Sequence, residues 1–112
     1  MRALRIIPGH TIELIDLEDS LEAWQEQVGG YVEFFCTRIS GHVVSVLCDE
    51  DARLKGLTCP SIVFRSGKPC ILGRVVITGP GEGEDLVAEL TEQQVQDIME
   101  CWDPILGRLE LR

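Results

Sequence analysis

The stretch DSLEAWQEQVGGYVEFFCTRI, residues 19–39, decides the fold, because two glycines join a helix pattern to a strand pattern. Asp19 and Glu22 have the spacing of a capping box, which predicts that a helix begins after Asp19. Gly29 is predicted to end that helix, since glycine readily adopts the left-handed conformation found there. The apolar stripe of the helix is expected to contain Leu17, Leu21, Trp24 and Val28.

Residues 31–39, the second half of the stretch, have the β-branched and aromatic composition of a strand. Because side chains alternate between the two faces of a strand, Val32, Phe34 and Cys36 are expected to share one face. That face is predicted to pack beneath Trp24 and Leu21 of the helix. We therefore interpret the stretch as scaffold, a helix laid on a sheet, and not as a functional motif.

The rest of the chain predicts further strands and one more helix. Apolar patterns indicate strands over residues 2–7, 11–15, 43–48, 62–64, 70–78 and 105–111, the last as an edge strand. Pro8 and Gly9 fit a type II turn between the first two strands, and Gly73 indicates a bulge or a close approach within its strand. Thr91 and Gln94 form a second capping box, so a second helix is expected after Thr91.

These elements predict a single α+β domain over residues 1–112, with a mainly antiparallel sheet of about five strands and two helices packed on one face. Residues 43–48 form a near-continuous apolar run, which favours a central position in the sheet. Trp24 and Trp102 are expected to be the largest anchors of the core.

The composition restricts the class and location of the protein. Hydrophobic residues make up 45% of the chain, as is typical of a globular domain. No apolar run approaches the length of a membrane-spanning helix, so no membrane partner is predicted. The N-terminal residues MRALRII have no small-residue cleavage site after them and are interpreted as a strand, not as a signal peptide. We therefore predict a cytoplasmic protein.

The five cysteines occur without a C-x-x-C pair, and neither histidine lies at a ligand spacing from them. This pattern argues against zinc, and an odd number of cysteines argues against a disulfide framework, so no metal and no cofactor are predicted. Cys36, Cys48 and Cys70 lie in apolar strands and are expected to be buried. Cys59 is expected in a loop, with no partner that would make it a nucleophile.

Three polar features are considered as sites, and each is interpreted as ordinary structure. Residues 79–85, GPGEGED, lack the spacing of phosphate-binding glycine motifs and carry three carboxylates that would repel phosphate, so an acidic loop is predicted. Residues 49–51, DED, are predicted to form a solvated turn and not a metal site. His10 and His42 have no serine or cysteine partner at a recognisable spacing, so no catalytic residue is assigned.

The charge distribution is the unusual feature of this chain. Ten basic and nineteen acidic residues give a net charge of −9. Residues 1–51 and residues 82–112 each carry a net charge of −7, whereas residues 52–81 carry +5 and contain no acid. Two interpretations of these five basic residues are open. In the first, they scatter over the surface and pair with acidic residues, also between copies of the chain. In the second, they converge into an anion-binding concavity, to which the fork of an arginine side chain is suited. They are Arg53, Lys55, Arg65, Lys68 and Arg74.

A set of short motifs occurs in a recognisable order along the chain. They are Pro8-Gly9, Leu21-Glu22-Ala23, Gln25-Glu26, residues 28–33 (VGGYVE), residues 49–57 ending in Lys55-Gly56-Leu57, a strand with Ile71, Gly73 and Val75, and T-E-x-Q from Thr91. This order resembles the bacterial and phage family called domain of unknown function 3846. Ser61 stands where members of that family usually have an asparagine after the proline. The resemblance implies no assigned activity and no catalytic residues, but it implies an association with phages and mobile elements.

Three functions are considered. The first is a non-enzymatic binding protein, encoded by a phage or mobile element, that sequesters or blocks a host factor; its acidic surface would imitate the charge of nucleic acid toward a basic host protein. The second is an oligomeric sponge for a small anionic nucleotide, such as an immune signalling nucleotide, which would use the five basic residues of segment 53–74. The third is an uncharacterised enzyme. Duplex nucleic acid is a poor partner, because a net charge of −9 repels it.

Overall fold

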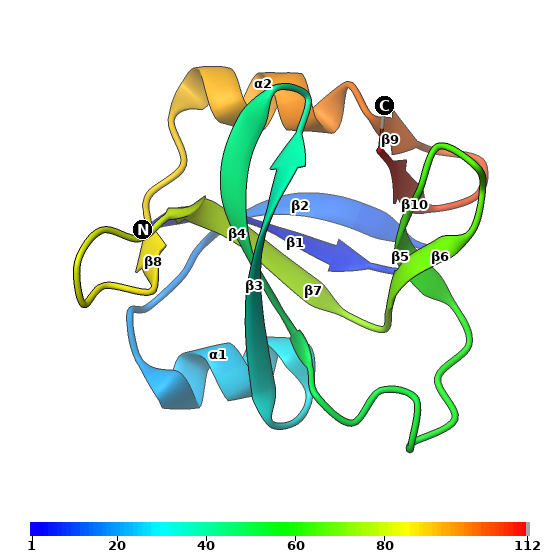
Figure 1. Cartoon of the computed structure of the whole chain (residues 1–112), viewed down its shortest axis with the longest axis horizontal. Helices are drawn as coiled ribbons and strands as arrows, with labels where there is room; N and C mark the ends of the chain where they lie inside the picture. The colour runs from blue at the N-terminus through cyan, green and yellow to red at the C-terminus, as the bar shows by residue number, and fades with distance from the viewer. Residues whose placement is uncertain (112) are drawn as a thin grey trace.

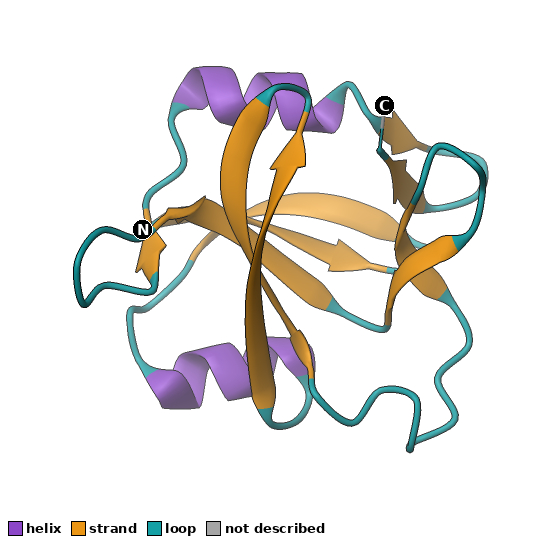
Figure 2. Ribbon diagram, in the orientation of Figure 1, coloured by secondary structure: helices purple, strands orange, loops and turns teal. Residues whose placement is uncertain are grey.

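The computed structural model of the protein describes residues 1–111 and contains two sheets and two helices (Figure 1). The larger sheet has the strand order β2-β1-β7-β4-β3, with β8 paired to β7, and the smaller sheet has the order β6-β5-β10-β9 (Figure 2). The elements are β1 (Arg2–Ile7), β2 (Thr11–Asp16), α1 (Leu21–Val28), β3 (Val32–Ile39), β4 (His42–Asp49), β5 (Pro60–Val63), β6 (Pro69–Leu72), β7 (Val75–Pro80), β8 (Val87–Ala88), α2 (Glu92–Met99), β9 (Trp102–Asp103) and β10 (Arg108–Glu110).

The predicted fold class, α+β with a mainly antiparallel sheet of about five strands and two helices, is confirmed. Every pairing in the larger sheet is antiparallel. β1 and β2 form the predicted hairpin, in which the His10 N–H donates to the Ile7 carbonyl at 3.0 Å and Gly9 has a φ of 77°. β4 lies between β7 and β3, the central position that its continuous apolar run predicts.

The predicted single strand over residues 70–78 is in fact two strands that belong to different sheets. β6 ends at Leu72 and β7 begins at Val75, and Gly73 between them has a φ of 81°. This change of direction requires a backbone conformation that glycine adopts without penalty. A Cβ at Gly73 would also lie 3.0 Å from Leu57 Cδ1, so the predicted close approach at this glycine is confirmed, whereas the continuous strand is wrong.

The predicted edge strand over residues 105–111 is a shorter, internal strand. β10 lies between β5 and β9 in the smaller sheet and runs parallel to β5. In the turn before it, the carbonyl of Gly107 accepts the Gly9 N–H at 2.8 Å. A Cβ at Gly107 would lie 2.5 Å from Gly9 Cα, so two glycines allow the β9–β10 turn to pack directly on the β1–β2 turn.

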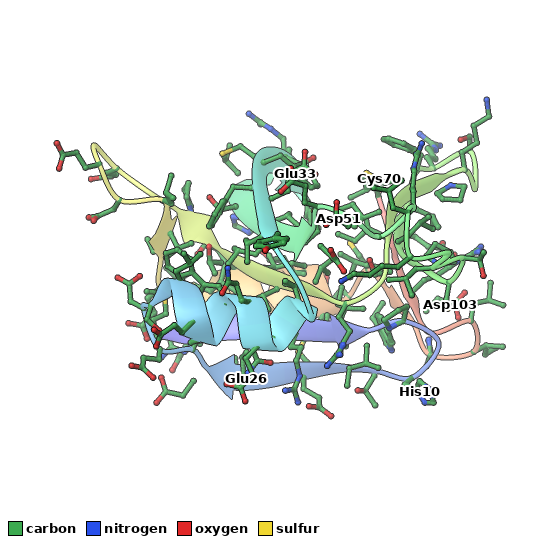
Figure 3. All side chains as sticks on the ribbon, turned by 90° about the horizontal axis from the view of Figure 1, so that it is seen from below. His10, Glu26, Glu33, Asp51, Cys70 and Asp103 are labelled. Carbon is green, nitrogen blue, oxygen red and sulfur yellow. The ribbon has the colours of Figure 1, made fainter. Side chains whose placement is uncertain are left out.

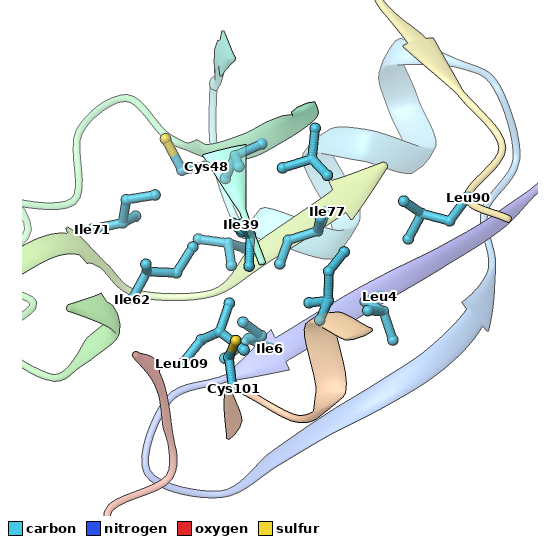
Figure 4. Packing of buried hydrophobic residues seen from close by; sticks show 14 residues of the cluster. Leu4, Ile6, Ile39, Cys48, Ile62, Ile71, Ile77, Leu90, Cys101 and Leu109 are labelled. Atoms are coloured by element: carbon cyan, nitrogen blue, oxygen red, sulfur yellow. The ribbon is translucent and has the colours of Figure 1, made fainter. Parts of the chain in front are cut away.

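Neighbouring residues of the central strands alternate between two apolar cores, and Figure 4 shows the larger one. Leu4 and Ile6 belong to the larger core together with Ile98 of α2, whereas Ala3 belongs to the smaller core together with Val28 of α1. Successive side chains of a strand point to opposite faces, so each helix covers its own face of the larger sheet. Figure 1 accordingly shows α1 and α2 on either side of β1 and β7, so the helices cover opposite faces of the sheet and not, as predicted, one face.

Local signals locate the start of both helices and the end of α1 to within one residue. Ser20, not Asp19, is the N-cap of α1, because its Oγ accepts a backbone N–H three residues later at 3.2 Å. Gly29 is the C-cap, as predicted, with a φ of 83°. α2 has the predicted capping box between Thr91 and Gln94, with hydrogen bonds of 2.8 Å and 3.1 Å. Neither helix in residues 1–111 is long and apolar enough to cross a lipid bilayer.

The tryptophans lie at the margins of the cores. Trp24 packs edge-to-face on Phe34, as predicted, with ring centroids 5.4 Å apart. Leu21 is 55% exposed, so Trp24 and Val28 cover this face without it. Trp24 and Trp102 are both half-buried, and the largest fully buried side chains are leucines and isoleucines. The expectation that the tryptophans are the main core anchors is therefore wrong.

Candidate functional site

The structure brings together two of the five basic residues of segment 53–74. Lys55 and Arg74 line one cleft, and Arg53 lines a separate hollow. Arg65 and Lys68 are exposed in the turn between β5 and β6. The predicted pairing of basic residues across an interface between copies of the chain stays a prediction, because it concerns a second copy.

The Lys55–Arg74 cleft lies where the two sheets meet and has a volume of about 310 Å³, at the lower end of the range for small-molecule sites. Its walls come from the β1–β2 turn, the end of α1, the end of β4, the loop after β4 and the β6–β7 junction. The lining residues are Ile7, Pro8, Val28, Gly29, Asp49, Lys55, Leu57, Gly73 and Arg74.

An ion pair between a buried carboxylate and a partly exposed ammonium forms one side of this cleft. The Asp49 side chain is only 2% exposed; its Oδ2 accepts from Lys55 Nζ at 2.7 Å, and its Oδ1 accepts from the Asp51 N–H at 2.9 Å. Lys55 Nζ also donates to the Gly29 carbonyl at 3.0 Å, and its side chain remains 42% exposed. The predicted solvated turn over residues 49–51 is therefore wrong for Asp49, which ends the buried run of β4.

Gly29 and Gly30 give the charged side chains room to reach the end of α1. A Cβ at Gly30 would lie 2.5 Å from Lys55 Nζ and 2.9 Å from Asp49 Oδ1, and a Cβ at Gly29 would lie 3.1 Å from an Arg74 guanidinium nitrogen. α1 has no basic residue in its own last turn. Lys55 and Arg74 therefore supply, from distant parts of the chain, the positive charge that stabilises the negative end of the helix dipole.

Arg74 carries the uncompensated charge of the cleft. The charge of Lys55 is balanced by Asp49, whereas the Arg74 side chain is exposed and forms no hydrogen bond or ion pair with any of residues 1–111. A guanidinium presents a planar fork of N–H donors that matches two oxygens of a phosphate or carboxylate. The cleft therefore combines a net positive charge with donors that are free to bind an anion.

A second hollow, here called the Tyr31 hollow, adjoins the cleft at Lys55. It has a volume of about 310 Å³ and is lined by Gln25, Gly30, Tyr31, Asp51 and Lys55. Tyr31 is 68% exposed, and the Asp51 carboxylate forms no hydrogen bond with residues 1–111. Figure 3 labels both Asp51 and His10 and shows the Asp51 side chain well away from His10 in the β1–β2 turn. The hollow thus combines an accessible aromatic ring with a free acceptor.

Arg53 lines a third hollow, of about 320 Å³, which the structure makes unfavourable for an anion. Glu33 and Glu50 line the same space, so carboxylates oppose the arginine. Cys48 and Cys70 line it too. Burial raises the pKa of the Cys48 thiol to about 11 and also raises the pKa of Cys70. Because the thiolate is the reactive form, both thiols are poor nucleophiles at neutral pH.

All five cysteines are free. Cys48 is buried, as predicted, and Cys70 is partly buried, but Cys36 is exposed, which contradicts its predicted burial. The reason is that β3 is an edge strand of the larger sheet and α1 lies beside only its first half (Figure 1). Cys59 is exposed in the predicted loop. Among residues 1–111, no group of three or more histidine, cysteine or acidic side chains is placed to hold a metal ion.

A polar pair that no sequence signal predicts joins β4 to α2. His42 Nε2 lies 2.7 Å from Asp97 Oδ2, and Gln93 Nε2 donates to Asp97 Oδ1 at 2.8 Å. The hydrogen bond with His42, followed by that with Gln93, holds the pKa of Asp97 below its usual value. Within the described part of the chain, neither histidine side chain bonds a cysteine or one of residues 49–51. The pair therefore fastens a helix to the sheet.

Motifs that carry the family resemblance meet at the Lys55–Arg74 cleft, since Pro8, Val28, Asp49, Lys55 and Gly73 all line it. No curated protein and no solved structure matches the chain. A family model does match, and it covers residues 1–103 of the 112. On that match, the chain belongs to the family described as Domain of unknown function (DUF3846).

Proposed function

We propose that this protein is a non-enzymatic binding protein that holds a small anion, bearing a phosphate or carboxylate group, in the Lys55–Arg74 cleft. The observation that carries the proposal is the guanidinium of Arg74, which lines the cleft and has no partner among residues 1–111. In the phage or mobile-element setting that the family resemblance implies, binding without turnover would sequester a host anion.

The donors of the cleft support binding of an anion oxygen at two points. An ammonium group has three N–H donors, and Lys55 uses two of them, one on Asp49 and one on Gly29, which leaves one for a ligand. The guanidinium fork of Arg74 supplies the other point. Because the whole chain carries −9, its long-range field repels anions, so binding would depend on these short-range contacts.

Thermal unfolding in the presence of inorganic phosphate and pyrophosphate tests the proposal. A ligand at about 100 times its Kd adds about 2.7 kcal/mol to the stability of the folded state, so we expect the Tm of the wild-type protein to rise by several degrees. Arg74→Gln should abolish the rise. Arg65→Gln, which removes the same charge from the exposed β5–β6 turn, should retain it.

Two results would contradict the anion site. One is a Tm that neither anion raises in the wild-type protein. The other is an equal rise in the wild-type protein and in Arg74→Gln, because the anion would then be bound elsewhere on the surface.

A second candidate is the blocking of a basic host protein, and the charge separation favours it, since residues 1–51 and 82–112 each carry −7. Pull-down from bacterial lysate, with an unrelated acidic protein of equal net charge as control, tests this candidate. We expect a partner that binds this protein, that the control does not retain, and that elutes at raised ionic strength. Recovery of the same proteins on both baits would refute the candidate.

A further inference from the structure

We infer, on the basis of the proposed anion site, that the Lys55–Arg74 cleft and the Tyr31 hollow together bind one nucleotide, with its phosphate at Arg74 and its base against the ring of Tyr31.

The two spaces adjoin each other at Lys55, beside the backbone that follows α1. Gly29 lines the cleft and Gly30 lines the Tyr31 hollow, and Lys55 lines both. The Lys55 ammonium, which donates to the Gly29 carbonyl at 3.0 Å, lies against Gly29 and Gly30 where the two spaces meet. A ligand that lies over the Lys55 ammonium would therefore extend toward Arg74 at one end and toward Tyr31 at the other.

The charges of the combined groove are arranged as a nucleotide requires. One end holds the unpaired guanidinium of Arg74, and the other holds the free carboxylate of Asp51 and the amide of Gln25. A nucleotide has an anionic phosphate at one end and donors, the ribose hydroxyls and the ring N–H or amino groups, toward the other. A carboxylate is an acceptor only, so Asp51 suits those donors and would repel a second phosphate.

Tyr31 distinguishes a nucleotide from a simple phosphate ester. Tyr31 is 68% exposed as a residue, so its ring is accessible to a flat ring system. Aromatic side chains bind bases of any sequence by stacking, because every base has a π-face. Inorganic phosphate or ribose 5-phosphate would fill only the arginine end of the groove and would leave the ring of Tyr31 in water.

Isothermal titration with guanosine and adenosine 5′-monophosphate, ribose 5-phosphate and inorganic phosphate tests the inference. We expect the better nucleotide to bind at least about tenfold tighter than ribose 5-phosphate, a difference of about 1.4 kcal/mol. Tyr31→Leu should remove that difference and leave ribose 5-phosphate binding unchanged, whereas Tyr31→Phe should keep it. Both substitutions alter an exposed side chain, so the variants should fold as the wild-type protein does.

The outcomes separate this inference from the anion site itself. If ribose 5-phosphate and the nucleotides bind equally, and Arg74→Gln weakens all of them, the nucleotide inference fails and the anion site stands. If nucleotides bind tightly but Tyr31→Leu has no effect, the base does not lie on Tyr31 and the inference also fails. If none of the four ligands binds, both proposals fail.

Discussion

The Asp49–Lys55 pair gives a prediction whose sign is unusual, namely that a second substitution restores stability. Lys55→Met removes the cation from a carboxylate that is 2% exposed. Adding Asp49→Asn then removes the carboxylate's charge. Because an unpaired buried charge costs more than a buried neutral amide, the double variant should be more stable than Lys55→Met alone.

The contacts set the expected magnitudes. Removing one partner of a fully buried ion pair costs about 3–5 kcal/mol. Here the Lys55 side is 42% exposed and Asp49 keeps its hydrogen bond from the Asp51 N–H, so water and backbone offset part of the loss. We expect Lys55→Met to lower the free energy of unfolding by about 2–3 kcal/mol, and Asp49→Asn, alone or in the double variant, to lower it by about 1–2 kcal/mol.

Urea unfolding followed by tryptophan fluorescence measures these values. Lys68→Met is the matched control, because Lys68 lies exposed in the β5–β6 turn and should change stability by no more than about 0.5 kcal/mol. If the double variant is as unstable as Lys55→Met or less stable, the buried charge of Asp49 is not the cause of the loss and the argument is wrong.

Gly107→Ala should lower the free energy of unfolding by about 2–4 kcal/mol, because a Cβ there would lie 2.5 Å from the β1–β2 turn. The control Gly41→Ala is also at positive φ but in open space, so it should lower the free energy of unfolding by only about 1 kcal/mol. Equal losses for the two variants in urea unfolding would contradict the packing argument. Asp97 has a pKa below its usual value, so its stabilising contribution is present above the usual carboxyl pKa and is lost as pH falls through the lowered one. Asp97→Asn should therefore flatten the fall of Tm below about pH 4, whereas Asp85→Asn in the exposed loop should keep the wild-type slope. Cys48, with a pKa of about 11, should react with iodoacetamide at neutral pH far more slowly than the exposed thiols, and peptide mass spectrometry that finds equal labelling would refute this.

The features that the sequence predicts correctly are local. Gly29 and the Thr91–Gln94 box mark helix ends because each acts on backbone groups within a few residues. The N-cap of α1 is displaced by one residue because Asp19 and Ser20 can both cap, and only the backbone decides which side chain reaches the free N–H. Such local signals determine where a helix or strand begins and ends, but not which other elements it packs against or pairs with.

The features that the sequence does not predict depend on contacts between distant segments. In CILGRVVIT, Gly73 and Arg74 interrupt the apolar residues, but such an interruption fits a bulge within one strand as well as the change of sheet between β6 and β7. The basic segment 53–74 contains Lys55 and Arg74, but only the tertiary fold brings these two side chains together at the C-terminal end of α1. The burial of Asp49 did have a sequence signal, because Asp49 directly follows the apolar run of residues 43–48 and the burial of β4 continues to its last residue.

The position of β10 in the middle of the smaller sheet has a consequence for aggregation. β10 joins β5 on one side and β9 on the other, and its Leu109 is fully buried. Proteolytic loss of residues 108–110 would leave two rows of unpaired backbone N–H and C=O groups facing each other across an empty slot. Open strand edges recruit strands from other molecules, so a protein clipped here would polymerise through that slot by accepting a foreign strand.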